Sequence, residues 1–156
     1  RHEKYFALQL LRDQIGQYVY PLHRLDRPTS GVLLFALDEE TARVMGKTFE
    51  ERAISKTYFA LTRGHLNDSG TIDYPLKEKL DKIADKFANT EKEAQTAISY
   101  YESVAIATLP IAVGKYDTVR YSLVKVVPET GRRHQIRRCQ TRGKSPRQVA
   151  TAVVGR

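Results

Sequence analysis

Three long runs of β-branched and aromatic residues constrain the fold more than any other feature of this sequence. They are "SKTYFALTRG" (55–64), "QTAISYYESVAIATLP" (95–110) and "RYSLVKVVPETG" (120–131), and each ends at Gly or Pro. Val, Ile, Thr and aromatic residues favour strands, whereas Gly and Pro terminate them. Successive strands joined by turns pair antiparallel, so we expect an α+β fold whose sheet is mixed and largely antiparallel, with flanking helices.

Two helices are predicted in the first third of the chain. Residues 6–17 show helical spacing of apolar side chains, and Gly16 is a suitable stop. The run "VLLFAL" (32–37) is typical of a buried strand, after which Asp38 caps a second helix whose first turn is acidic. The apolar stripe of that helix is Ala42, Met45 and Phe49. Residues 73–87 predict an irregular entry and a short, highly charged helical turn.

Composition indicates one soluble domain, residues 1–156, with a basic C-terminal end. The net charge is +8, and residues 120–156 hold ten Lys and Arg against one acid, Glu129. Such asymmetry favours a polyanionic partner, most often nucleic acid, although a solubilising basic tail would have the same composition. No apolar run reaches the ~20 residues that a membrane span needs, and no signal peptide is recognisable. With a single cysteine, Cys139, we expect a cytoplasmic protein without a disulfide framework.

Several chemistries lack their sequence signatures. The nine glycines never form a GxG pattern, so no dinucleotide or phosphate-binding loop is predicted. The four histidines are far apart in the sequence, and none has metal-ligand spacing. Hydride transfer, nucleotide hydrolysis and zinc chemistry are therefore disfavoured.

The stretch "HRLDRPTSG" (23–31) places one carboxylate, Asp26, between Arg24 and Arg27 and follows it with a turn. In an extended backbone Leu25 can anchor the segment while Asp26 faces a groove. Nearby guanidinium groups lower the pKa of a carboxyl group, and an ionised, immobilised Asp suits nucleophilic attack or electrostatic stabilisation. A purely structural Arg–Asp pair at a hairpin entry would have the same sequence.

A second polar stretch, "TGRRHQIRRC" (130–139), places four arginines and a histidine after a strand and a Gly turn. If a helix begins here, Arg133 and Arg137 share a face, His134 and Arg138 share another, and Ile136 points inward. This arrangement could grip phosphate and supply an arginine to a buried acid, or it could be a solvated basic face.

Tyr58 lies in the first of the predicted strands. Alternation places it on one face with Lys56, Ala60 and Thr62, which is weak support for a ring at the edge of a site. A tyrosine on a strand is more usually part of the core.

Together and in this order, the three stretches resemble motifs of the RluA-type pseudouridine synthases. "HRLDRPTSG" is similar to the H-R-L-D-x-x-T-S-G motif of that family, "SKTYFALTRG" to K-x-Y-x-A-x-x-x-G, and "TGRRHQIRR" to T-G-R-x-H-Q-I-R. The stretches 73–88 and 114–132 resemble more narrowly the members that act on the uridine at position 65 of transfer RNA.

The resemblance implies a fold, an activity and residue roles. It implies an isomerase that needs no metal or cofactor, with Asp26 as the catalytic nucleophile, Arg137 as its partner and Tyr58 packed against the target base. It implies that Arg24 fills the space left by a flipped base, since flipping leaves a gap in the stack. The full set of expected RNA-binding residues is Arg24, Arg27, Arg132, Arg133, His134 and Gln135.

The sequence departs from the family at both ends. An upstream N-K-P-x-G-x-x-V-H motif is absent except for a remnant at Arg1-His2, and after Arg138 the family continues with a histidine and an apolar run. Here Cys139 and an atypical, polar and basic tail (140–156) follow instead, in which only "VATAVV" (149–154) is able to pack. We expect a partial catalytic domain with a truncated or frame-shifted end.

Our principal interpretation is a monomeric enzyme that converts a uridine of transfer RNA to pseudouridine. One alternative is a pseudouridine synthase of the same family that acts on ribosomal RNA. Another is a non-catalytic RNA-binding fragment. Salt-sensitive RNA binding is expected in every case, so binding alone does not separate them.

Overall fold

The computed structural model describes residues 5–77, 93–139 and 147–153. The chain divides into two compact units, Arg1–Ile54 and Ser55–Arg156. The predicted helical turn within 73–87 lies largely outside the described residues, which end at Lys77 on that side. None of the described helices is long and apolar enough to cross a membrane.

The first unit contains two helices and short strands. Helix α1 spans Ala7–Ile15, and Gly16 follows it in the left-handed conformation (φ 71°), as predicted, because a residue without Cβ adopts that backbone at least cost. Strand β1 (Tyr20–Pro21) pairs antiparallel with β3 (Phe35–Ala36), and β2 covers only Thr29–Ser30.

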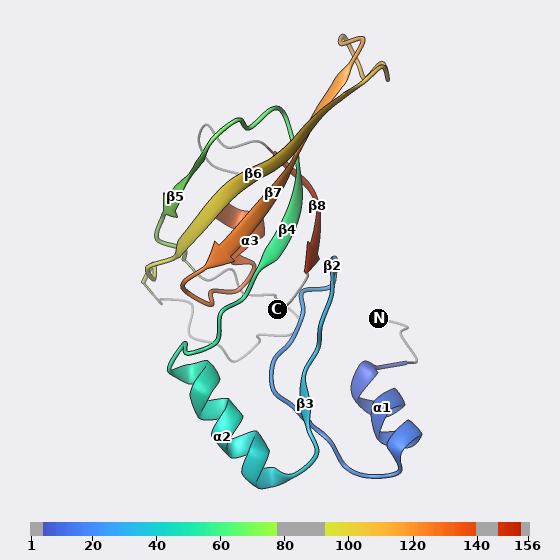
Figure 1. The fold of residues 1–156 in the computed structure, drawn as a ribbon, viewed down its shortest axis with the longest axis vertical. Helices are drawn as coiled ribbons and strands as arrows, with labels where there is room; N and C mark the ends of the chain where they lie inside the picture. The colour runs from blue at the N-terminus through green and yellow to red at the C-terminus, as the bar shows by residue number, and fades with distance from the viewer. Residues whose placement is uncertain (1–4, 78–92, 140–146, 154–156) are drawn as a thin grey trace. The chain divides into compact units, whose positions relative to one another are not determined.

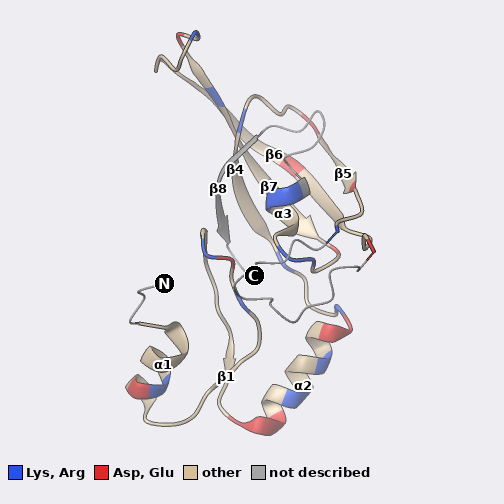
Figure 2. Ribbon diagram, turned by 180° about the vertical axis from the view of Figure 1, so that it is seen from behind, with Lys and Arg blue, Asp and Glu red and all other residues tan. Residues whose placement is uncertain are grey.

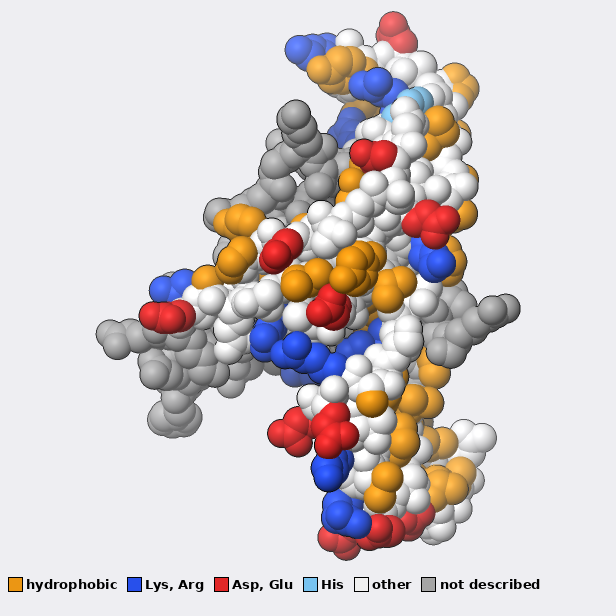
Figure 3. Space-filling model, turned by 60° about the vertical axis from the view of Figure 1, so that its left-hand side comes forward, with side chains coloured by type: hydrophobic (Ala, Val, Ile, Leu, Met, Phe, Trp, Pro, Cys, Tyr) orange, Lys and Arg blue, Asp and Glu red, His pale blue; other side chains and the backbone are white. Residues whose placement is uncertain are grey.

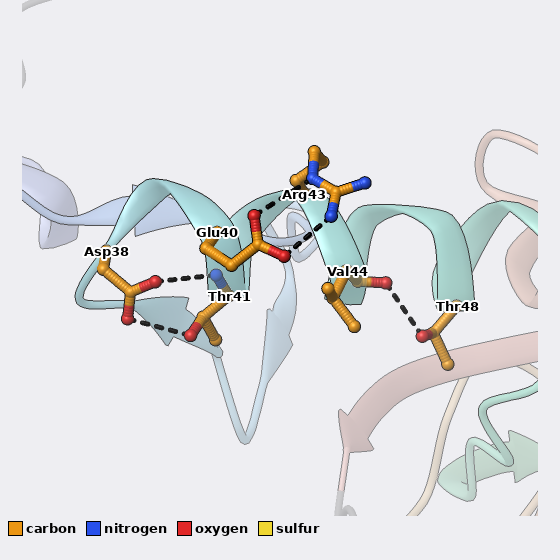
Figure 4. Close-up of polar contacts among 6 residues, drawn as sticks. All are labelled: Asp38, Glu40, Thr41, Arg43, Val44 and Thr48. Carbon is orange, nitrogen blue, oxygen red and sulfur yellow. Dashed lines mark hydrogen bonds and ion pairs between the residues drawn. The ribbon is translucent and has the colours of Figure 1, made fainter.

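Helix α2 (Glu39–Glu50) begins as the sequence predicts (Figure 4). The carboxylate of Asp38 accepts hydrogen bonds from the backbone N–H of Thr41 at 2.7 Å and from its hydroxyl at 2.8 Å. These bonds to the ionised form hold the pKa of Asp38 below its usual value. The predicted apolar stripe is confirmed, since Ala42, Met45 and Phe49 are the half-buried apolar positions of the helix.

The prediction of a buried strand over 32–37 was wrong in extent. Only Phe35 and Ala36 are in a strand, and Ala36 alone is buried, whereas Val32, Leu34 and Leu37 are 40–58% exposed. The physical reason is that β3 pairs with only two residues of β1, and so short a ladder buries little.

The second unit is an antiparallel sheet with the order β8-β4-β7-β6-β5 (Figure 1). The strands are β4 (Tyr58–Arg63), β5 (Ser69–Asp73), β6 (Ile98–Leu109), β7 (Val119–Pro128) and β8 (Arg147–Val153). All four pairings in this order are antiparallel. The three predicted strands are therefore present, and β8, which includes most of the "VATAVV" stretch of the tail, pairs with β4.

The main core of this unit lies where one face of β4 and β7 meets helix α3 (Gln135–Cys139). Its buried side chains are Ala60, Val124, Val126 and Ile136. Ile136 thus points inward, as the sequence predicts. The β6–β7 hairpin runs on past the neighbouring strands, and hydrophobic and charged side chains lie together at its far end (Figures 1 and 3). Its exposed apolar residues include Val104, Ile106, Ile111 and Tyr116.

Candidate active site

Asp26 lies in a tight turn of the first unit. The backbone N–H of Thr29 donates to the carbonyl oxygen of Asp26 at 2.8 Å, which closes a turn over Arg27 and Pro28. The Asp26 side chain is half-buried, and Arg24 and Arg27 are exposed. Gly31 follows with φ 145°, a backbone that L side chains avoid, so glycine is required for the chain to leave the turn in this direction.

His23 makes two contacts near Asp26 that the sequence did not predict. Its Nε2 accepts a hydrogen bond from the backbone N–H of Leu34 at 3.1 Å, and its ring stacks on Phe49 of α2, with centroids 5.4 Å apart. Because Nε2 accepts, it must be unprotonated. His23 therefore links the segment just before Asp26 to the residue that precedes β3 and to α2.

Tyr58 begins β4 on the face that forms the core. The burial pattern of β4 shows Ala60 and Thr62 fully buried on that face, with Leu61 and Arg63 exposed on the other. Tyr58 therefore lies on the same face as the core, and its place at the edge of a site stays a prediction. Tyr58 itself is half-buried against the cluster that contains Ile136.

The segment Thr130–Cys139 lies on the same face of the sheet. A Cβ built on Gly131 would stand 3.8 Å from the ammonium nitrogen of Lys56, so the beginnings of the two predicted motifs are neighbours in space. Arg132 is half-buried, and its Nε donates to the carbonyl oxygen of Thr96 at 3.0 Å. Arg137 is exposed, whereas the two residues before it, Gln135 and Ile136, are buried.

The backbone makes a sharp bend immediately before α3. His134 has φ +56°, a left-handed conformation that is uncommon for any residue except Gly and marks a locally constrained turn. Its carbonyl oxygen accepts from the backbone N–H of Arg138 at 3.0 Å, and the carbonyl oxygen of Arg132 accepts from the N–H of Gln135 at 3.0 Å. The side chains of Arg133 and His134 are half-buried.

Positive charge gathers on α3 and the turn before it (Figure 2). The acid nearest in sequence, Glu129, accepts a hydrogen bond from the hydroxyl of Tyr100 at 2.8 Å, and this contact raises the pKa of Tyr100. Residues 129–139 carry one carboxylate, Glu129, and four arginines, of which Arg137 is exposed.

The structure thus groups the predicted site residues in two sets. Asp26, Arg24 and Arg27 belong to the first unit, and Tyr58 and the residues of the 130–138 segment belong to the second. Over the described ranges, no three His, Cys, Asp or Glu side chains lie together in a way that could hold a metal ion.

Comparison with known proteins gives one family. The family model described as "RNA pseudouridylate synthase" matches residues 1–141, a region that spans both units. The chain is 55% identical over 138 residues to tRNA pseudouridine synthase C of Yersinia pestis, covering 88% of this chain and 54% of the relative. It is 57% identical over 138 residues to the protein of that name from Pasteurella multocida, covering 88% of this chain and 57% of the relative. The chain therefore spans about half the length of the curated relatives it matches.

Two solved structures have a similar fold. "Human RNA Pseudouridylate Synthase Domain Containing 4" aligns with a TM-score of 0.58 at 26% identity, over 83% of this chain and 49% of that chain. "Human RNA Pseudouridylate Synthase Domain Containing 1" aligns with a TM-score of 0.69 at 22% identity, over 92% of this chain and 64% of that chain, and at this identity it shows the fold alone. The predicted α+β fold is confirmed.

Proposed function

Because the chain belongs to the RNA pseudouridylate synthase family, we propose that it converts uridine in RNA to pseudouridine. The observation that carries this proposal is the family match over residues 1–141, which includes the turn of Asp26, the half-buried Tyr58 and the basic segment that ends in α3. The resemblance stated from the sequence is thereby confirmed at the level of the family.

The proposed reaction exchanges one bond of the nucleoside for another. The glycosidic bond between N1 of uracil and C1′ of ribose breaks, the base rotates, and C5 of the base bonds to C1′. The proton on C5 is released and N1 gains a proton, so no oxidant, reductant or second substrate is consumed. The carboxylate of Asp26 acts as the nucleophile, either on the base or on the sugar, and splits one difficult step into two easier ones.

The remaining residues take the roles that the family motifs imply. Arg137, exposed on α3, is the charged partner of Asp26, and the half-buried ring of Tyr58 packs against the target base. Arg24, exposed beside the turn, occupies the space that the flipped base vacates. Arg27, Arg132, Arg133 and His134 lie on the two polar segments and contact RNA phosphate and sugar groups.

The proposed substrate is transfer RNA, and the proposed target is the uridine at position 65. The support is the identity of 55–57% with relatives that are named tRNA pseudouridine synthase C. We propose that the protein acts as a monomer in the cytoplasm.

Tritium release tests this proposal. Transcripts of transfer RNA and of ribosomal RNA, each carrying uridine tritiated at C5, are incubated with the full chain, and the tritium freed into water is counted. We expect release from transfer RNA only, at most one tritium per molecule, and none when cytidine replaces the uridine at position 65. Release from ribosomal RNA alone would assign the other substrate, and RNA binding without release would mark a non-catalytic fragment.

A further inference from the structure

Gln135 is the most completely engaged polar side chain at the candidate site. It is only 5% exposed, and its amide makes four hydrogen bonds within the chain. Its Oε1 accepts from the hydroxyl of Thr130 at 2.9 Å and from the backbone N–H of Arg132 at 2.9 Å. Its Nε2 donates to the carbonyl oxygen of Ile98 and to the hydroxyl of Ser99, each at 2.9 Å.

These four bonds use the whole capacity of the amide. A glutamine side chain offers two lone pairs on oxygen and two hydrogens on nitrogen, and all four are taken. The orientation of the amide is also fixed, because the N–H of Arg132 can only donate and the carbonyl of Ile98 can only accept. A hydrogen bond from Gln135 to RNA would require breaking one of these buried bonds.

The network extends one step beyond Gln135 into the sheet. Thr130, only 3% exposed, receives a hydrogen bond from the backbone N–H of Ile98 at 3.0 Å and donates to Gln135. Ser99 is 1% exposed on β6. The turn before α3, the start of α3 and strand β6 are therefore joined by one closed, buried set of hydrogen bonds.

Helix α3, which begins at Gln135, is too short to be stable without contacts to the rest of the unit. Helix α3 has five residues, far below the ~12 that an isolated helix needs to be even marginally stable in water. Its placement depends on two buried side chains at its start. The apolar Ile136 packs in the core, and the polar Gln135 donates hydrogen bonds to residues of β6. The next residue is Arg137, which is exposed.

We infer that Gln135 is a positioning residue that sets the place of Arg137, and not a residue that contacts RNA. This inference rests on the proposed function and replaces the sequence prediction of an RNA contact at Gln135. By holding the N–H of Arg132 and the start of α3 against β6, the amide fixes the direction in which the following arginine leaves the helix. Such preorganisation affects the rate of the chemical step more than the affinity for substrate.

Kinetics of Gln135→Met and Gln135→Glu test the inference. Met has similar length and removes all four hydrogen bonds, whereas Glu keeps the acceptor and removes the two donors to β6. We expect kcat for tritium release to fall roughly tenfold to a hundredfold in both variants while KM for RNA changes by less than about threefold. A raised KM at unchanged kcat would show a direct RNA contact and would overturn the inference.

A matched control separates positioning from general loss of stability. Thr62→Val removes another buried polar contact of the same unit, the 3.3 Å bond from the Thr62 hydroxyl to the carbonyl oxygen of Ser122, at a fully buried site. We expect it to lower the unfolding temperature without changing kcat at temperatures where the protein is folded. If Thr62→Val lowers kcat as much as Gln135→Met, the effect is one of stability and the positioning role is wrong.

Amide hydrogen exchange gives a measurement that does not depend on turnover. In Gln135→Met the N–H of Arg132 loses its acceptor, so its exchange should accelerate at least about tenfold relative to the parent chain, while Thr62→Val leaves it unchanged. Unchanged protection in Gln135→Met overturns the inference even if the parent releases no tritium from any RNA. Absence of tritium release by the parent chain would contradict the proposed function, but it would not contradict the role of Gln135 in positioning the segment that carries Arg137.

Discussion

The segments that carry Arg137 and Asp26 are held in place by different means. Arg137 follows two buried residues, and one of them, Ile136, belongs to the core of the second unit. Asp26 lies in a turn that is closed by one backbone hydrogen bond and is flanked by His23, whose imidazole bonds to the backbone of Leu34. The helix that carries Arg137 is thus held by the core and the buried hydrogen bonds of Gln135, and the segment of Asp26 by a turn and by the contacts of His23 with Leu34 and Phe49.

This contrast predicts how substitutions act. Changes around Arg137 should lower both activity and the free energy of unfolding, because the same groups hold the helix and the sheet together. Changes around Asp26 should disturb local order and activity with little effect on global stability, because few buried apolar groups are involved.

Arg137→Met should lower turnover roughly a hundredfold, because it leaves the proposed nucleophile without its charged partner. The variant should still fold, since Arg137 is exposed. Steady-state tritium release measures the effect. Arg138→Met makes the same change of charge one position later and should alter turnover only a few-fold. Equal losses of turnover in the two variants would show that Arg137 contributes only to the general positive charge and is not the specific partner of Asp26.

Ile136→Ala should lower the free energy of unfolding by about 2–4 kcal/mol, because it leaves a cavity among Ala60, Val124 and Val126. Urea unfolding followed by circular dichroism measures this loss. Ile15→Ala on α1 removes the same atoms from a side chain that is 40% exposed and should cost well under half as much. Similar costs at the two positions would contradict the assignment of α3 to the core.

His23→Phe should lower turnover about tenfold, because the ring can still stack on Phe49 but cannot accept from the N–H of Leu34. The direct readout is exchange of the Leu34 amide hydrogen, which should accelerate in this variant. His23→Gln restores an acceptor at a similar reach and should recover much of the protection. If the Leu34 amide hydrogen exchanges equally slowly in His23→Phe and in the parent chain, His23 does not position the Asp26 turn.

Asp38→Ala should lower the unfolding temperature by a few degrees, because the first turn of α2 loses the hydrogen bonds that the Asp38 carboxylate accepts from Thr41. The lowered pKa of Asp38 also predicts how the stability of the folded state changes with pH. A carboxyl group with a depressed pKa in the folded state contributes stability that is present at neutral pH and is lost as the pH falls below about 4. Circular dichroism between pH 6 and pH 3 should show that this acid-sensitive component is absent in Asp38→Ala.

Local signals in the sequence predicted most of the elements correctly. Gly16 as a stop, Asp38 as a cap and the β-branched runs of β4, β6 and β7 all act through nearby atoms, so their effects can be recognised without knowledge of the fold. The inward direction of Ile136 followed from helical periodicity in the same way.

The missed features concern burial, which depends on what lies above a strand. Alternation placed Tyr58 with Ala60 and Thr62 correctly on one face, but it could not show that α3 covers that face. The exposure of Val32 and Leu37 has the same origin, since a run of apolar residues does not specify the layer that should cover it. The network of Gln135 joins residues 36 and 37 positions apart, and no local pattern signals such contacts.

The site residues remain predictions in their chemical roles. The structure places Asp26 in a turn of the first unit. It places Arg137 on helix α3 of the second unit, which is held by buried contacts of Ile136 and Gln135. The three sequence motifs imply the roles of Asp26 and Arg137. The family match supports these roles as proposals.

Single-turnover tritium release by the parent chain beside Asp26→Asn, with transfer RNA tritiated at C5 of uridine, tests whether Asp26 is the nucleophile. Asn keeps the size of the side chain and removes the nucleophilic carboxylate, so RNA binding should persist while release falls by roughly a thousandfold or more. Release by the parent alone, with equal RNA affinity of both proteins, is the result that this account predicts. Equal release by both proteins would contradict it, because the nucleophile would then lie elsewhere.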